Sequence, residues 1–596
     1  MKFASFMESI YLGKPGKDNL FYRETPEDDP TVAKLVKAYK ASMADYSPAD
    51  MESGDRMPPG LLAKLKKIGF FGLIIPKEYG GLGLDLHQYI AIIERISGMD
   101  MAVGILALAH LSIGIKGILL FGNPEQKRKY LTPAASGKMI FCYALTEPRI
   151  GSDGRNITTT AEISPDGTYY TLNGSKTFIT NANYAGGMTV FARLEGAPKG
   201  TLGAFIVERA WEGVSVGRDM PKMGLKASST ASIHFKNVRV PAENLLGQPG
   251  DGFKIAMTIL NYGRLALGAA SAGIMEVSYN DMVKRASSRV QFGRPIIGFE
   301  LIREKLLRAY VEKEVIRAMT HFTAGFLEHD PVGYVAIESS HCKLYGTTRA
   351  WPTLYEAMQT AGGSGYLSTA PYEKRMRDFR VTTIFEGTTE IHSMYPPLSL
   401  ARNLNKLLRH KNPLLRLLML TAARFRHAIP GVSAGSLLRR IGKPEGGGAD
   451  PSVRSPRQGA EHSGVFAGKT GRRFSYRALR NALRTARRGV RRFRGLFLAA
   501  VIRFGPRLPE RELLLRRLTR ISMHVYGILA VSAKIGYLRQ QGRPTHELAA
   551  ILDTFRLKAE REFRKNRNLR PDGFERRLMG LFHLLDRART GEEQGA

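Results

Sequence analysis

YYTLNGSKTFIT, residues 169–180, is a short segment in which apolar and polar side chains alternate. GAFIVER (residues 203–209) and ASIHFKNVRV (residues 231–240) resemble it, and Gly, Pro, Asp and Asn separate such segments throughout residues 138–247. A period of two, with turn residues between the segments, is typical of antiparallel strands. This stretch therefore predicts a β unit in the middle of the chain.

Helical periodicity precedes and follows the β unit. Before it, apolar residues recur at helical spacing from about residue 31 to 131, as in LLAKLKKIGFFGL (residues 61–73), and GGLGL (residues 80–84) forms a loop. After it, LIREKLLRAYVEKEVIRAMTHFTAGFLEH (residues 301–329) belongs to a helical stretch that ends near residue 405. We predict an α+β fold with an N-terminal helical domain (1–138), a middle antiparallel β domain (139–248) and a helical bundle (249–405).

The last third of the chain has a different composition. Gly, Pro and Ser are frequent between residues 429 and 469, which predicts a flexible basic linker over 406–475. Residues 472–494 are rich in arginine and contain no acidic residue. Residues 510–565 are amphipathic with helical spacing, so we predict an extra C-terminal helical domain over 476–596.

The positive charge is concentrated in this last third. Residues 403–596 hold 42 Lys+Arg and 14 Asp+Glu, a net charge of +28, whereas residues 1–402 hold 47 and 39, a net charge of +8. Charge of this kind bears on partners and solubility rather than on the fold. A nearly balanced body thus carries a strongly basic tail.

Composition also limits the compartment and the kind of site. Two cysteines, Cys142 and Cys342, do not build a disulfide framework, and neither lies in a metal-binding motif, so we predict no metal. The N-terminus lacks a secretory signal, and no uncharged apolar run reaches the roughly 18 residues that a membrane span needs. We expect a cytoplasmic protein.

Six segments, in order, carry a family resemblance. YALTEPRIGSDG (residues 143–154), FITNA (178–182) and QTAGGSGYLSTAPYEKRMRDFRVTTIFEGTTEIH (359–392) resemble the signature elements of the acyl-CoA dehydrogenases. GLKASSTASIHFKNVRVPAENLLG (224–247), GFKIAMTILNYGRLALGAASAG (252–273) and RVQFGRPI (289–296) agree with them. GILLFG (117–122), ILNYGR and the extra C-terminal region most resemble the very-long-chain branch. The resemblance implies FAD-dependent α,β-dehydrogenation of a long-chain fatty acyl-CoA to the trans-2-enoyl-CoA, the first step of β-oxidation.

Glu386 is the predicted catalytic base. The α-proton of an acyl thioester is weakly acidic, and a carboxylate can take it if burial raises its pKa from about 4.3. Glu386 follows two apolar residues and precedes Gly387, which permits close approach of backbone to ligand. By resemblance it is the family's catalytic glutamate, and its N–H binds the thioester carbonyl as an oxyanion hole does. Some branches place the base at the position of Gly263, which accepts no proton.

No GxGxxG motif follows a strand, so a Rossmann site is not predicted. The resemblance instead assigns FAD to these residues: Tyr143, Leu145, Thr146, Phe178, Thr180, Arg289, Gln291, Phe292, Gln359, Gly362, Gly363, Thr388 and Glu390. It places the first five around the isoalloxazine ring. The others reach the pyrophosphate and the adenosine end across a subunit interface, which implies a homodimer or a higher oligomer.

The resemblance assigns the acyl-CoA to Ser152, Asn261, Arg264 and Gly387. An arginine suits phosphate because its planar fork offers paired donors, although Arg264 could equally be a helix-surface residue. Two departures bear on the site. Phe178 stands where the family usually has tryptophan, and Arg149 with Ile150 replaces small residues in the TEPxxGSD turn. Ala102 and Leu108 replace glycines of the long-chain branch, which predicts a shorter acyl pocket.

The partners follow from the resemblance and from the tail. Electron-transfer flavoprotein is the expected electron acceptor, and an acyl-CoA oxidase that passes electrons to O2 is the alternative. The basic tail fits an anionic membrane surface, with peripheral attachment to the inner face of the membrane. A solvated linker is the second interpretation. A DNA-binding flavoprotein comes last, because the Glu386 motif is intact.

Overall fold

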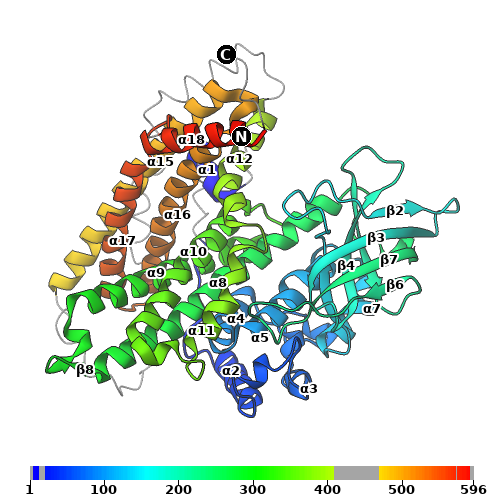
Figure 1. The fold of residues 1–596 in the computed structure, drawn as a ribbon, viewed down its shortest axis with the longest axis horizontal. Coiled ribbons are helices and arrows are strands. Elements are labelled where there is room, and N and C mark those ends of the chain that lie inside the picture. Colours follow the sequence, from blue (N-terminus) through cyan, green and yellow to red (C-terminus); the bar gives the residue numbers. More distant parts are fainter. Residues whose placement is uncertain (1–4, 13–20, 409–468, 572, 591–596) are drawn as a thin grey trace, which may run out of the picture. The chain divides into compact units, whose positions relative to one another are not determined.

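The computed structural model describes residues 5–12, 21–408, 469–571 and 573–590. The chain divides into two compact units. One is Leu20–His392, which we call the core unit. The other combines Met1–Asn19 with Ser393–Ala596, and we call it the terminal unit. Figure 1 shows the helices and strands of both units.

The core unit begins with helices, several of which have their first turns capped by acidic or amide side chains. Asp29 accepts a hydrogen bond from the N–H of Val32, and Asp85 forms a capping box with Gln88. These caps start helices at the positions where the apolar periodicity begins. The helices are α2 (Pro30–Met43), α3 (Leu61–Lys67), α4 (Leu86–Met99), α5 (Met101–Ala107), α6 (Lys116–Phe121) and α7 (Pro124–Ala135).

Between α5 and α6 the helix widens. Residues Leu108–Gly114 form a π-helical segment, and the N–H of Ile115 donates to the carbonyl of His110, five residues earlier, at 2.9 Å. Such segments are rare and often lie at functional sites. This one is buried throughout and contains Leu108, one of the two residues expected to shorten the acyl pocket.

A seven-stranded sheet follows, in the order β1–β4–β2–β3–β7–β6, with β5 paired to β4. Four of the strand pairings are antiparallel, as predicted, but β1 and β2 each run parallel to β4. The strands are β1 (Ile140–Ala144), β2 (Thr160–Ile163), β3 (Tyr169–Thr180), β4 (Ala185–Leu194), β5 (Leu202–Glu208), β6 (Val214–Val216) and β7 (Thr230–Pro241).

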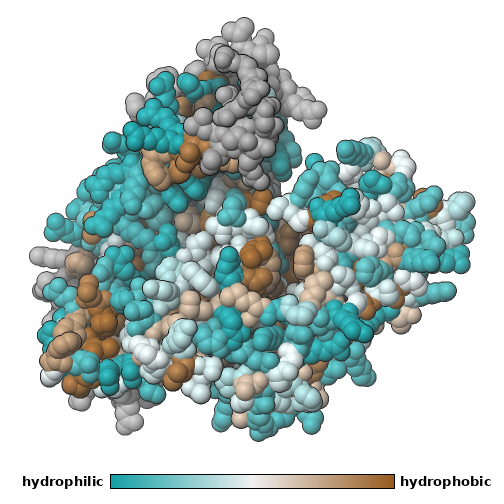
Figure 2. All heavy atoms as spheres, in the orientation of Figure 1, coloured by the Kyte–Doolittle hydropathy of each residue, from teal (hydrophilic) through white to brown (hydrophobic). Residues whose placement is uncertain are grey.

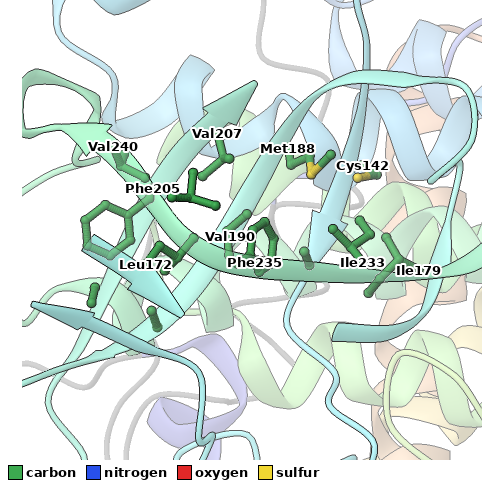
Figure 3. Packing of buried hydrophobic residues seen from close by; sticks show 14 of the residues in the cluster. Cys142, Leu172, Ile179, Met188, Val190, Phe205, Val207, Ile233, Phe235 and Val240 are labelled. Carbon is green, nitrogen blue, oxygen red and sulfur yellow. The ribbon is translucent and has the colours of Figure 1, made fainter. Parts of the chain in front are cut away.

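The sheet encloses a dry core. In β7, buried and more exposed positions alternate, which is the period of two that predicted the strand. Figure 3 shows the side chains of Leu172, Val190, Phe205, Ile233 and others, drawn from several strands and packed together. Strand β5 is instead buried at six successive residues, because both of its faces are covered.

Long helices complete the core unit. They are α8 (Gly252–Ser288), α9 (Glu300–His329), α10 (Ala336–Ala361) and α11 (Tyr372–Arg380), and a small hairpin of β8 (Val290–Gln291) and β9 (Arg294–Pro295) joins the first two. Helix α8 crosses α4 at Gly273, where an added Cβ would lie 1.8 Å from the carbonyl oxygen of Glu94. Glycine is therefore required for these two helices to approach each other.

The terminal unit is helical. Helix α12 (Thr389–Leu408) begins at the end of the core unit, and α1 (Phe6–Leu12), α15 (Lys469–Phe504), α16 (Glu512–Gln540), α17 (His546–Lys565) and α18 (Gly573–Thr590) complete the described part. Helices α15, α16 and α17 lie side by side (Figure 1). Tyr11 of α1 stacks on Phe493 at 3.9 Å and hydrogen-bonds Ser522 at 2.8 Å, so the two ends of the sequence share one core.

The arginine-rich segment is a helix with two faces. Leu479, Leu483, Val490, Phe493 and Phe497 of α15 are buried, and its arginines lie mainly on the exposed side. The helix starts at Lys469, inside the range predicted as linker, because its apolar residues recur at helical spacing among the arginines. Residues 409–468 of the predicted linker lie outside the described residues.

Two segments of the described chain, Met101–Phe121 and Glu512–Gln540, are long and apolar enough to cross a membrane. Their most apolar windows are 89% and 94% buried within the structure, as in the core helices of a soluble protein. Lys116 and Lys534 interrupt them, which is why neither contains a long uncharged run.

A buried ion pair fixes the loop between β1 and β2. The ammonium of Lys176 on β3 lies 2.8 Å from Glu147, and both side chains are almost fully buried. The Glu147 carboxylate also accepts hydrogen bonds from both N–H groups of Thr158 and Thr159 and from the hydroxyl of Thr158. Burial alone would raise the pKa of Glu147, but Lys176 and these donors lower it to about 2.

Replacing this lysine tests the ion pair. We expect Lys176→Met to lower the free energy of unfolding by about 3–5 kcal/mol, because it leaves the Glu147 charge buried without its partner. Chemical denaturation followed by circular dichroism measures this. Arg193→Gln, which breaks an exposed pair with Glu195, is the control and should cost about 0.5 kcal/mol or less. An equal effect of the two substitutions would contradict the assignment.

Candidate active site

The predicted base lies in a strained loop. Glu386 and Gly387 have φ angles of 57° and 96°, two successive residues in the left-handed region, just before α12 begins at Thr389. Glycine adopts this conformation freely, whereas a glutamate does so at a cost of about 1–3 kcal/mol. Backbone strain of this kind persists only where neighbouring groups enforce it.

Hydrogen bonds from three helices enforce it. The carbonyl oxygen of Glu386 accepts from Nε of Arg264 on α8 at 3.4 Å and from Nε2 of His392 on α12 at 2.9 Å. The carbonyl oxygen of Gly387 accepts from the ammonium of Lys343 on α10. The N–H of Glu386, by contrast, donates to no other described residue. Both carbonyls are held while this N–H stays available to a ligand.

The carboxylate of Glu386 rests against α8 at Gly263. A Cβ at position 263 would lie 2.8 Å from Oε2 and 3.0 Å from Oε1 of Glu386, so only glycine leaves room for the carboxylate. Oε2 is buried and has no hydrogen-bond partner among the described residues. Position 263, where some branches carry the base, is thus the point of α8 that the Glu386 carboxylate contacts.

The electrostatics of the site favour proton transfer near neutral pH. Burial raises the pKa of Glu386 to about 7, although the nearby positive charges of Arg264 and Lys343 oppose the rise. Burial also lowers the pKa of Lys343 to about 7, against the attraction of Glu386. The pKa of the Tyr143 phenol is raised by burial and by the charge of Glu386, which places β1 beside the loop of Glu386 and Gly387. A carboxyl with these properties can both hold and release a proton.

Residues predicted to contact the flavin ring lie on β1 and β3. Tyr143 is half-buried on β1, and Leu145 and Thr146 follow that strand. Phe178 has a φ of 55° and is 66% exposed, at an irregularity of β3. The hydroxyls of Thr146 and Thr180 bind no other described residue. An exposed aromatic ring and two uncommitted hydroxyls fit a planar polar cofactor.

The other residues predicted to contact FAD occupy two exposed loops. Arg289, Gln291 and Phe292 lie at the β8–β9 hairpin, where Phe292 is 94% exposed. Gln359, Gly362 and Gly363 lie at the exposed end of α10, and an added Cβ at either glycine would meet no atom within 4 Å. These loops are open to a ligand or to a second subunit.

Of the last two residues assigned to FAD, Thr388 accepts a hydrogen bond from the N–H of Ile391 at 3.3 Å and so helps to start α12, while Glu390 is exposed. The structure thus gives Thr388 a local role within the loop. The cofactor contacts of both residues stay predictions.

The residues predicted to bind acyl-CoA separate into two groups. Ser152 is exposed, after a turn in which the backbones of Glu147 and Ile150 pair, so the departure at Arg149 and Ile150 still closes a tight turn. Asn261 and Arg264 are buried. Asn261 accepts from the hydroxyl of Ser339 at 2.8 Å, and Arg264 supports the carbonyl of Glu386. Their contact with substrate stays a prediction.

Sequence reasoning missed Ser340, Lys343 and the role of His392. Ser340 and Lys343 share a face of α10, and both are fully buried. A polar pair at this spacing in an otherwise buried helix indicates from sequence that the two residues have a role. The spacing does not predict which loop they contact. Among the described residues, no group of three or more His, Cys, Asp or Glu is placed to hold a metal.

The sequence matches known protein families. Sequence models of the acyl-CoA dehydrogenase N-terminal, middle and C-terminal domains match residues 26–138, 142–238 and 250–395. The chain therefore belongs to the acyl-CoA dehydrogenase family, a family of oxidoreductases. The predicted fold class, with its extra C-terminal helices, is confirmed.

Individual relatives extend the match to the terminal unit. The mitochondrial very long-chain specific acyl-CoA dehydrogenase of Bos taurus is 35% identical over 98% of this chain and 87% of its own length. An acyl-CoA dehydrogenase of Bacillus anthracis, solved with FAD, has a TM-score of 0.73 and 26% identity, covering 96% of this chain and 94% of its own. Butyryl-CoA dehydrogenase of Megasphaera elsdenii, at a TM-score of 0.59 and 33% identity, covers only 63% of this chain although all of its own is matched.

A methyl group at position 263 tests whether the position of the Glu386 carboxylate depends on its contact with Gly263. Alanine normally stabilises a helix by about 1 kcal/mol relative to glycine, so Gly263→Ala should fold. Its Cβ would displace the Glu386 carboxylate, and we expect kcat with an acyl-CoA to fall roughly 100-fold, with flavin still bound.

Steady-state kinetics and the visible spectrum measure the two effects. Gly495→Ala adds a methyl group to α15 where no atom lies within 4 Å, and it is the matched control. Undiminished kcat in Gly263→Ala would show that activity does not depend on the contact between the carboxylate and Gly263.

Proposed function

We propose that the chain binds FAD and catalyses α,β-dehydrogenation of a long-chain fatty acyl-CoA to the trans-2-enoyl-CoA, with Glu386 as the base. The observation that carries the proposal is the buried, unpartnered Oε2 of Glu386, whose carboxyl has a pKa of about 7. A buried carboxylate oxygen without a hydrogen bond is costly to maintain, and proton abstraction is a function that explains the cost.

The chain's own groups divide the chemistry between them. The carboxylate of Glu386 takes the α-proton, and its free N–H is suited to the thioester carbonyl, where negative charge develops. Bound FAD supplies the acceptor for the β-hydride. Phe178, Thr146 and Thr180 would hold it beside β1 and β3, which supports a cofactor within reach of the catalytic loop.

Electron-transfer flavoprotein is the proposed electron acceptor, and a long fatty acyl chain is the proposed substrate. Both follow from the similarity to the very-long-chain relatives over 98% of the chain. The alternative, transfer to O2, would make the protein an oxidase. Its flavin, once reduced by substrate, would reoxidise in air without electron-transfer flavoprotein.

We also propose a homodimer through the β8–β9 side of the core unit. Val290, Phe292, Leu301 and Leu307 are all exposed there. Figure 2 shows hydrophobic side chains around this hairpin. Apolar groups gathered on a surface commonly mark an interface, and the mass of the purified protein in solution tests this one.

We propose that anionic lipid binds to the terminal unit. Arg477, Arg480, Arg484 and Arg491 are exposed at helical spacing on α15. On α18, Phe574, Leu578 and Leu581 are exposed beside Arg576 and Arg577. Exposed apolar groups next to arginine suit the boundary between lipid headgroups and acyl chains. We propose a cytoplasmic enzyme that attaches peripherally to the inner face of the membrane.

Anaerobic bleaching of the flavin by an acyl-CoA tests the base. Glu386→Gln removes proton acceptance but keeps the shape of the side chain, so we expect loss of bleaching by at least about 1000-fold in rate, with flavin bound. In the wild type the rate should fall as pH drops below about 7, because the carboxyl must be ionised to act. Retained bleaching in the variant would remove Glu386 as the base, and air reoxidation of the wild type would indicate an oxidase.

Vesicle sedimentation tests the membrane surface. Replacing Arg477, Arg480, Arg484 and Arg491 by glutamine should weaken binding to phosphatidylglycerol vesicles by 10-fold or more at low salt, since each basic residue contributes about 1 kcal/mol. The matched control replaces four exposed lysines of the core unit, Lys34, Lys37, Lys40 and Lys67, by glutamine. Equal loss in both variants, or retention by duplex DNA in place of vesicles, would overturn the membrane assignment.

A further inference from the structure

We infer that Lys343, Ser340 and His392 form a positioning clamp, which fixes the carbonyls of Glu386 and Gly387 so that the carboxylate and N–H of Glu386 stay available to the substrate. The inference rests on the proposed role of Glu386. None of the three side chains need touch the substrate. They hold the main chain of the loop that carries the base.

The first half of the clamp is Lys343. Its side chain is fully buried, and its ammonium donates to the carbonyl of Gly387, which is its hydrogen bond among the described residues. Burying an ammonium with so few partners is costly, and an apolar side chain would fill the same space on α10 without that cost. The lysine therefore serves a purpose other than packing, and its one bond points to the catalytic loop.

The second half is the relay from Ser340 to His392. A carbonyl oxygen only accepts hydrogen bonds, so Nε2 of His392 must carry the proton that it shares with Glu386. Burial, with the nearby charges of Arg264 and Lys343, keeps the pKa of His392 well below its usual range, and the ring is neutral. Nδ1 is then bare and accepts from the hydroxyl of Ser340 at 2.7 Å. Ser340 thus satisfies the ring nitrogen that this tautomer leaves without a proton, and it holds the His392 ring in place.

The clamp addresses the strain in the loop. Two successive left-handed residues are strained, and the Glu386 carboxylate rests against Gly263 in this backbone conformation. Helix α10 contributes Ser340 and Lys343, α8 contributes Arg264, and α12 contributes His392, so three helices restrain one peptide segment. Catalytic groups need support of this kind, since a displacement of 1 Å can cost about 100-fold in rate.

The charged and titratable groups around Lys343 decide how pH enters the test. They are Glu386 in the loop, Arg264 on α8 and Glu390 on α12, and His341 of α10 acts on His392. Removing the positive charge of Lys343 leaves the Glu386 carboxyl easier to protonate. The acid side of the pH–rate profile should then move to higher pH, whereas a substitution that only loosens packing would leave it in place.

Lys343→Met, tested as the full-length protein with FAD bound, should lower kcat roughly 10- to 100-fold, change KM less than about threefold and shift the acid limb upward. Lys116→Met is the matched control. Lys116 is also buried with a pKa lowered to about 7, but it lies over the ring of Tyr262 and has no bond to the loop. Its pH profile should match that of the wild type.

If Lys343→Met does not fold, variants of His392 test the clamp instead. His392→Leu removes the donor to Glu386 and should lower kcat at least 10-fold, while His392→Gln offers an amide N–H at that place and should restore most of it. Wild-type kcat and pH profile in Lys343→Met, or equal activity in the Leu and Gln variants, would overturn the clamp. Loss of bleaching in Glu386→Gln alongside either result would leave the proposed function standing.

Discussion

The contact between the Glu386 carboxylate and helix α8 at Gly263 is the constraint on which the site depends. A missing side chain at position 263 makes a hollow, and the carboxylate fills it with one oxygen buried and without a hydrogen bond. Desolvation then raises the pKa of the carboxyl to about 7, which suits a base that must later release its proton. The contact with Gly263 thus determines both the position of the Glu386 carboxylate and its raised pKa.

Nearby positive charge limits how far burial raises the pKa of Glu386. Arg264 and Lys343 are both buried near Glu386, and without them burial would raise its pKa further. Nε of Arg264 and the ammonium of Lys343 each donate a hydrogen bond to a main-chain carbonyl of the loop. The two charges attract the Glu386 carboxylate, whose Oε2 has no hydrogen-bond partner among the described residues. A direct ion pair would stabilise the base and make it a poorer proton acceptor.

Much of the architecture was predictable, and the failures have physical reasons. Residues 169–180 and 231–240 alternate because one face of each strand is buried, and the helical spacing on either side predicted the domain order. The parallel pairing of β1 with β4 was not predictable, because alternation carries no information on strand direction. The arginine-rich α15 was partly assigned to a linker, although Leu479, Leu483 and Phe493 form an apolar stripe within it.

For the site, the motif around Glu386 was sufficient to indicate the loop that carries the proposed base, since a loop of this kind is local in sequence. Lys343 was not predictable, because its contact is with a carbonyl 44 residues later and depends on how α10 packs. Arg264 was assigned to the acyl-CoA by resemblance, and the structure adds a contact that the motif did not predict, a hydrogen bond to the carbonyl of Glu386. The substrate contact itself stays a prediction.

The packing of α1 in the terminal unit has a consequence for how the protein is made. Tyr11 is synthesised before its partner Ser522, which follows 511 residues later. At about 5–20 residues per second, α1 waits roughly 25 to 100 seconds for its binding site to be synthesised. During that time the core unit can fold, while the apolar face of α1 stays exposed. Helix α1 is therefore made well before the helices that complete its packing.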